Sequence, residues 1–166
     1  MATDSSVPRH FSVNLAQLKL VGAGNTLSPK AVQLADLYGL CTEDRLFLGL
    51  WQNNSLDAAV FNPGDRIAVR GDRVHSAYVV VSGDMKASDQ QNSFTLGSGS
   101  VIGLAEGMGN LPHALTITAT TTVKTRIIHI GQARQVLLQI NTGLRGIFRT
   151  AIARTLGLTE IPENLK

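Results

Sequence analysis

The sequence has few of the residues that build metal centres, disulfides or common catalytic motifs. Its single cysteine, Cys41, cannot form an internal disulfide and leaves no CxxC pair for metal or redox chemistry. No GxSxG motif is present, and Gly97-Ser98-Gly99 lacks a phosphate-loop lysine. The four histidines form no HxH or HxxxH pair that could ligate a metal; they are His10, His75, His113 and His129. We therefore expect a protein that is not an enzyme and binds no metal.

Long hydrophobic runs are also missing. The longest uninterrupted apolar run, Ala77 to Val81, is far shorter than the ~20 residues that a membrane helix needs. Asp4 and two serines stand near the N-terminus, where a signal peptide has basic and then apolar residues. We therefore expect a cytoplasmic protein with no membrane partner.

What is present fits one globular domain. A chain of 166 residues with 43% hydrophobic and 16% charged residues can bury a sufficient core. The net charge of +3 is mild but unevenly distributed, because no acid lies between Met108 and Leu158. Six bases fall there: Lys124, Arg126, Arg134, Arg145, Arg149 and Arg154. This stretch is either a solvated basic face or a surface that attracts phosphates or an acidic partner.

The patterning predicts a mainly β fold with flanking helices. Ser28-Pro29 is a good helix start, with a serine cap before proline at the first helical position. Short β-rich runs alternate with glycine turns from residue 58 to 130, which is typical of an antiparallel β-roll or jelly roll, a double-stranded β-helix. The helical period then returns and predicts two C-terminal helices. The predicted segments are a flexible arm at 1–24, one domain at 25–158 (helices 28–54, β-roll 58–130, C-terminal helices 132–157) and a tail at 159–166.

An ordered series of turns within the predicted roll carries a family resemblance. The series runs from Phe61-Asn62-Pro63-Gly64-Asp65 through Gly71-Asp72 and Ser82-Gly83 to a segment that ends at Pro112-His113-Ala114-Leu115-Thr116. With its flanking helices, this series resembles the cyclic nucleotide-binding domain family over roughly Leu46 to Leu156. The resemblance implies a stand-alone sensor or regulatory module that binds a small phosphate-containing ligand.

In that family, the segment matching Ile102–Thr116 is the phosphate-binding cassette, which reads Phe-Gly-Glu, seven residues, then Pro-Arg-Ala/Ser-Ala-Thr. Gly103, Pro112, Ala114 and Thr116 keep its framework without a gap. The resemblance implies that main-chain N–H groups at the start of a short helix bind the phosphate. The implied ligand-binding residues are Gly103, Leu104, Ala105, His113, Ala114 and Thr116.

Two matched positions depart from the family. Leu104 stands at the ribose-binding glutamate and cannot accept a hydrogen bond, whereas His113 stands at the phosphate-binding arginine and cannot offer its bidentate fork. Glu106 is an alternative acid, although its use requires a shorter cassette. We therefore expect altered specificity for a cyclic nucleotide (cAMP or cGMP) or a related phosphate ligand. The alternative is a degenerate domain that no longer binds nucleotide and acts as a protein-protein interaction or dimerisation module.

The C-terminal part of the sequence indicates which macromolecules the chain is expected to bind. About ten residues follow Leu156, too few for the helix-turn-helix that many bacterial relatives carry, so we expect no sequence-specific DNA binding. The last predicted helix gathers small residues, Gly146, Thr150 and Ala153, opposite its apolar stripe. Small, uncharged faces let a second backbone approach closely. The sequence thus favours a homodimer with these residues near the axis, the alternative being a solvated face.

Overall fold

In the computed structural model, the described residues are 11–12, 57–139, 142–156 and 159. The helices expected over 28–54 lie outside these residues. The same holds for the expected arm except Phe11–Ser12, and for the tail except Thr159. The fold below is therefore that of the roll and the two helices that follow it.

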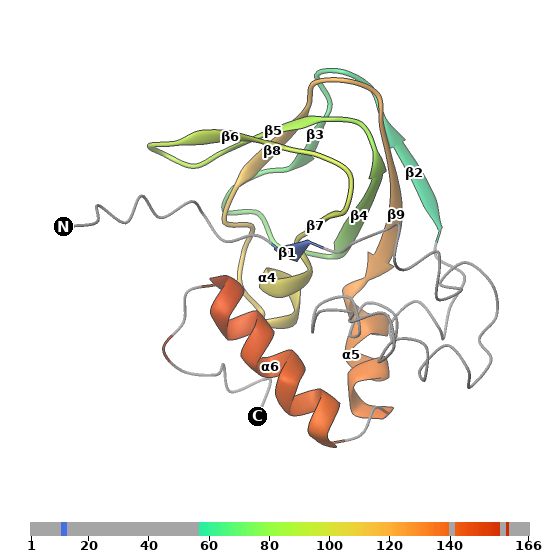
Figure 1. The fold of residues 1–166 in the computed structure, drawn as a ribbon, viewed down its shortest axis with the longest axis vertical. Helices are drawn as coiled ribbons and strands as arrows, with labels where there is room; N and C mark the ends of the chain where they lie inside the picture. Colours follow the sequence, from blue (N-terminus) through green and yellow to red (C-terminus); the bar gives the residue numbers. More distant parts are fainter. Residues whose placement is uncertain (1–10, 13–56, 140–141, 157–158, 160–166) are drawn as a thin grey trace, which may run out of the picture.

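Two antiparallel sheets form the roll, as the sequence predicts (Figure 1). The five-stranded sheet has the order β1 (Phe11–Ser12), β7 (Ser100–Ile102), β4 (Ser76–Ser82), β9 (Val123–His129) and β2 (Ala58–Phe61). The four-stranded sheet has the order β3 (Arg66–Ala68), β8 (Thr116–Ala119), β5 (Met85–Ser88) and β6 (Ser93–Leu96). All strand pairs are antiparallel, so the prediction of a roll in place of a parallel α/β sheet is confirmed.

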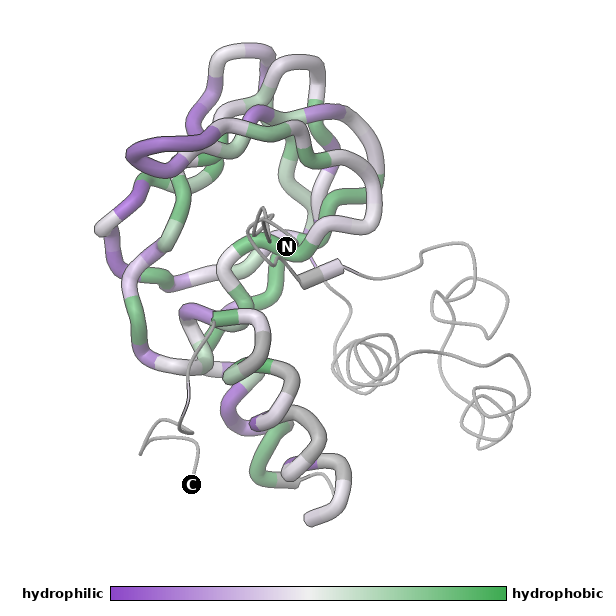
Figure 2. Tube along the Cα trace, turned by 60° about the vertical axis from the view of Figure 1, so that its left-hand side comes forward, coloured by the Kyte–Doolittle hydropathy of each residue, from purple (hydrophilic) through white to green (hydrophobic). Residues whose placement is uncertain are grey.

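Alternation along the strands produces the core. In β5, Met85 and Ala87 are fully buried while Lys86 between them is exposed, because successive side chains point to opposite faces of a sheet. Val80 and Val123, from the other sheet, are equally buried and belong to the same cluster. Hydrophobic and hydrophilic stretches alternate along the roll in Figure 2. Complete burial of each large apolar side chain stabilises the fold by about 1.5–3 kcal/mol.

The tight turn between β4 and β5 depends on Gly83. Its φ of 101° lies in the left-handed region that favours glycine. A Cβ at this position would also collide with the carbonyl oxygen of Thr122 and stand 2.8 Å from Cα of Val123. The Ser82-Gly83 turn seen in the sequence is therefore required both by backbone conformation and by close packing against the start of β9.

Within the described residues, three helices follow or interrupt the roll. The short α4 (Leu104–Met108) lies between β7 and β8, and α5 (Ile130–Gln139) and α6 (Thr142–Leu156) follow β9. The two C-terminal helices are thus confirmed, with α5 beginning two residues before the predicted position 132. Contacts join α4 to both α5 and α6, which places these helices against one end of the roll (Figure 1). None of the helices within the described part of the chain is long and apolar enough to cross a membrane.

Candidate functional site

The segment that resembles the cassette runs from β7 through α4 to β8, and its first turn is built on Gly103. This residue has a φ of 80° and is the N-cap of α4. A Cβ here would stand 2.9 Å from Cε1 of His113 and 3.2 Å from Cγ1 of Val74. Glycine therefore allows the left-handed turn and also lets the His113 ring lie directly against the main chain.

The start of α4 presents main-chain donors. Its first helical hydrogen bond runs from the Gly107 N–H to the Gly103 carbonyl oxygen, at 2.9 Å. The amides of Leu104, Ala105 and Glu106 precede that bond and so have no acceptor inside the helix. Three successive donors at one turn can hydrogen-bond an anion such as a phosphate, and charged acceptors make the stronger bonds.

His113 is fixed by the loop before β4. Its N–H donates to the Asp72 carbonyl oxygen and its own carbonyl oxygen accepts from the Gly71 N–H, both at 2.9 Å. Pro112 forms a bridge with Arg73 in the same loop. These main-chain bonds join two segments far apart in sequence and hold the histidine ring against Gly103.

The environment of His113 keeps its ring neutral near pH 7. The residue is only 9% exposed. Burial lowers the pKa of His113, and the negative charges of Glu106 and Asp72 raise it by less. A neutral imidazole can donate one hydrogen bond to a phosphate, but it brings no positive charge.

Positions 104 and 106 are the two places in the cassette where an acid for the ribose could stand. Leu104, at the family's glutamate position, is 1% exposed and packs as an apolar core residue. Glu106, the alternative acid, is half-buried on α4. Its charge acts on the His113 ring.

The end of the cassette is partly engaged in structural contacts. Ala114 is exposed, and Thr116 is half-buried at the first position of β8. The Thr116 hydroxyl oxygen accepts a hydrogen bond from the Arg70 N–H at 3.1 Å. This bond ties β8 to the loop after β3, and the hydroxyl hydrogen stays available to donate.

The small residues of α6 lie apart from the cassette positions in sequence. Gly146 and Thr150 are exposed, whereas Ala153 is half-buried. The Thr150 hydroxyl donates to the Gly146 carbonyl oxygen at 3.0 Å, one helical turn earlier. This bond satisfies the Thr150 hydroxyl hydrogen within its own helix.

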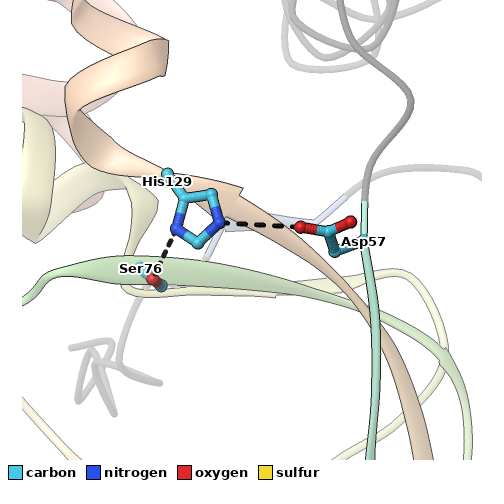
Figure 3. Close-up of polar contacts among 3 residues, drawn as sticks. All are labelled: Asp57, Ser76 and His129. Carbon is cyan, nitrogen blue, oxygen red and sulfur yellow. Dashed lines mark hydrogen bonds and ion pairs between the residues drawn. The ribbon is translucent and has the colours of Figure 1, made fainter.

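A serine, a histidine and an aspartate also meet on the five-stranded sheet (Figure 3). The Ser76 hydroxyl lies 3.2 Å from Nδ1 of His129, and Nε2 of His129 lies 3.8 Å from the Asp57 carboxylate. The side chains of His129 and Asp57 are 48% and 78% exposed. Ser76 and His129 are cross-strand partners of β4 and β9, so sheet register brings them together. An open surface does not supply the sheltered pocket that nucleophilic catalysis uses.

Two structural features of the site had no signal in the sequence. Arg134 of α5 donates from Nη2 to the Gly107 carbonyl oxygen of α4, at 2.9 Å. In the sequence, Arg134 was one member of the basic stretch with no assigned role. The main-chain support of His113 by Gly71 and Asp72 is likewise invisible in sequence, because it depends on how distant loops meet. Across the described segments, no group of three or more His, Cys, Asp or Glu residues could hold a metal ion.

No protein-family model and no curated protein matches the sequence. Solved structures do match. The cGMP-bound form of the EAL enzyme Bd1971 is similar with a TM-score of 0.53 and 17% identity, covering 61% of this chain and 29% of that one. Its cAMP-bound form is similar with a TM-score of 0.52 and 16% identity, covering 59% of this chain and 28% of that one. The chain thus matches less than a third of that enzyme.

A second similar structure spans most of both chains. It is described as Sp-2Cl-cAMPS bound to PKAR CBD2, and it has a TM-score of 0.52 and 17% identity. The match covers 90% of this chain and 92% of that one. With the two antiparallel sheets and the helix between β7 and β8, this likeness shows that the chain has the fold of the cyclic nucleotide-binding domains.

Proposed function

We propose that the chain is a regulatory module that binds a phosphate-containing ligand, a cyclic nucleotide or a relative of one, in segment 101–116. One observation carries this proposal: the amides of Leu104 to Glu106 have no acceptor within α4, and the His113 ring packs against Gly103 at the start of that helix. Main-chain donors do not depend on side-chain identity, so they survive the two departures from the family pattern. The ligands in the similar structures, cAMP and cGMP, support the choice of ligand class.

The same two departures argue for altered specificity. A ribose hydroxyl buried against Leu104 would lack an acceptor, at a cost of about 1–3 kcal/mol. His113 offers the phosphate one hydrogen bond from a neutral imidazole, whereas an arginine offers two parallel bonds from a charged guanidinium, so the phosphate is held more weakly. The favoured ligand is therefore one whose phosphate is held mainly by the main chain and whose sugar needs no hydrogen-bond acceptor at position 104.

Calorimetry with cAMP, cGMP and cyclic dinucleotides tests the proposal. We expect binding by at least one member of the panel, and loss of that binding in His113→Ala. His113→Arg should tighten cyclic nucleotide binding by about tenfold, because it restores a charged fork for the phosphate. Lys124→Gln, on the exposed side of β9, is the matched control and should bind as the unaltered protein does. No heat from any ligand, together with no response to His113→Arg, would contradict the proposal.

A second candidate function is an interaction module without a nucleotide. One observation favours it: Leu104 and His113 are 1% and 9% exposed, so both family ligand positions serve the packing of this chain. Such a domain would act through its surface, with α6 as the candidate dimer interface. This function predicts that no ligand of the panel binds and that the protein forms a stable dimer.

A further inference from the structure

A pocket of about 430 Å³ lies where the loop before β4, the end of α4 and the start of α5 meet. Three basic residues line it: Arg73 and His75 from the loop before β4, and Arg134 from α5. The Asn110 side chain adds an amide that can donate hydrogen bonds. Among the described lining residues none is acidic. The pocket is therefore a local concentration of positive charge and donors within a concave surface.

Hydrogen bonds fix the walls of this pocket. The Arg134 guanidinium donates from Nη2 to the Gly107 carbonyl oxygen at 2.9 Å. That bond uses one of five N–H donors and leaves the others for a ligand. The Ile130 N–H donates to the His75 carbonyl oxygen at 3.1 Å, and Arg73 is bridged to Pro112. The backbone segments that carry the three basic residues are thus already tied to one another, which fixes the spacing of their main chains.

The start of α5 adds to the positive potential. Gly131, the second residue of this ten-residue helix, lines the pocket. Its amide precedes the first hydrogen-bonded turn and has no acceptor inside the helix, and the helix dipole is positive at this end. The nearest acids in sequence are Asp72 and Glu106, and neither lines the pocket.

We propose that this pocket is a second anion site, selective for the phosphate group of a small phosphorylated molecule. Two guanidinium groups, an imidazole and an amide match the several oxygens of a phosphate, and arginine binds such groups with paired hydrogen bonds. The volume fits a small ligand. The pocket shares the wall residues Gly107, Asn110, Leu111 and Pro112 with segment 101–116. None of the residues implied to bind the cassette ligand lines it, namely Gly103, Leu104, Ala105, His113, Ala114 and Thr116, so the proposed site is a neighbour of the cassette site with different ligand contacts.

Inorganic pyrophosphate is the probe for this site. We expect saturable ¹H–¹⁵N shift changes at the amides of Gly131 and Arg134 when the full chain is titrated at constant ionic strength. Gly131→Asp should weaken pyrophosphate binding by about tenfold or more, because a carboxylate then lies in the pocket. A Cβ at Gly131 meets nothing within 4 Å, and an acid at a helix start favours the helix, so this variant should fold.

Two controls separate charge from shape and position. Gly131→Asn places a neutral side chain of the same shape in the pocket and should bind within about twofold of the unaltered protein. Arg70→Gln removes an exposed positive charge from the same loop, but Arg70 does not line the pocket, so binding should be unchanged. The double change Arg73→Gln and Arg134→Gln should abolish saturable binding.

Three outcomes would overturn the proposal. The first is a response that sodium chloride alone reproduces, and the second is equal binding by Gly131→Asp and the unaltered protein. The third is a titration confined to the amides of Leu104 to Glu106, since that pattern places the anion in the cassette. His113→Ala separates the two sites, because it should remove ligand binding in the cassette and leave the shifts at Gly131 in place.

Discussion

At His113, burial and neighbouring charge act on the same imidazole in opposite directions. Burial lowers the pKa below the usual 6.5, and Glu106 and Asp72 raise it by a smaller amount. In the unfolded chain the imidazole is solvated and takes up a proton near its usual pKa. Between the lowered folded value and 6.5, the unfolded state therefore binds more protons. The free energy of unfolding should fall as the pH drops through this window.

His113→Gln tests this pH dependence at the scale of one residue. Urea unfolding of the unaltered protein and of the variant should be compared from about pH 8 to pH 5. We expect a constant difference in stability above about pH 7.5, where the imidazole is neutral in both states. Below pH 6.5 the difference should shift in favour of the variant, because glutamine takes up no proton. A difference that stays constant over the whole range would show that the folded and unfolded pKa values are alike.

Among the helices, the spacing between α4 and α5 depends on one missing side chain. A Cβ at Gly107 would stand 2.5 Å from Cδ1 and 2.7 Å from Cγ1 of Ile130, and 3.0 Å from Cγ1 of Val74. Ile130 and Val74 are 4% and 6% exposed, so neither can move aside freely. Gly107 thus lets α4 lie directly against the start of α5, beside the Arg134 hydrogen bond.

Gly107→Ala and Gly131→Ala should therefore change stability in opposite directions. Alanine is the better helix former by about 1 kcal/mol, but overpacking at Gly107 costs typically 1–3 kcal/mol, so we expect a net loss there. A Cβ at Gly131 meets nothing within 4 Å, and Gly131→Ala should stabilise the fold by about 0.4–1 kcal/mol. Chemical unfolding of both variants measures the difference. Stabilisation by both would mean that the α4–α5 contact adjusts without cost.

The elements differ in how far local sequence determines them. β4, β5 and β6 lie within the stretch predicted to be β-rich, because apolar residues alternate or cluster there between glycine turns. β2 and β7 are short and lack a clear alternation, so they are defined by pairing: β2 with β9, and β7 with β1 and β4. The assignment of the cassette positions rests on the family resemblance and stays a prediction. The His113–Gly103 contact and the Arg134–Gly107 bond had no signal in the sequence, because they arise where loops distant in sequence meet.

At the scale of the molecule, the basic C-terminal stretch has more than one role. Arg134 joins α5 to α4. Arg145 donates from Nε and Nη2 to the carbonyl oxygens of Leu137 and Leu138, at 3.1 and 2.9 Å. These carbonyls belong to the last turn of α5, where cationic donors are favourable. Lys124 lies exposed on β9. Some of these basic residues make structural hydrogen bonds and others are exposed charges. A net basic composition therefore does not by itself define a binding face.

The proposed homodimer is the prediction that concerns the whole molecule. Gly146 and Thr150 are exposed on α6, and small residues allow close approach of a second helix. A Cβ at Gly146 meets nothing within 4 Å, so Gly146→Arg should not disturb the folded chain and should improve its helix propensity by about 0.8–1 kcal/mol.

Light scattering coupled to size-exclusion chromatography should then give a dimer for the unaltered protein and a monomer for Gly146→Arg, with no loss of thermal stability beyond that expected from the lost association. Gln135→Arg, which adds the same charge at an exposed position of α5, should remain dimeric. A monomeric unaltered protein at high concentration, or a dimeric Gly146→Arg, would exclude this face of α6 as the interface. Because the variant adds a bulky charge where the chain itself makes no contact, any change of mass must come from contact between chains.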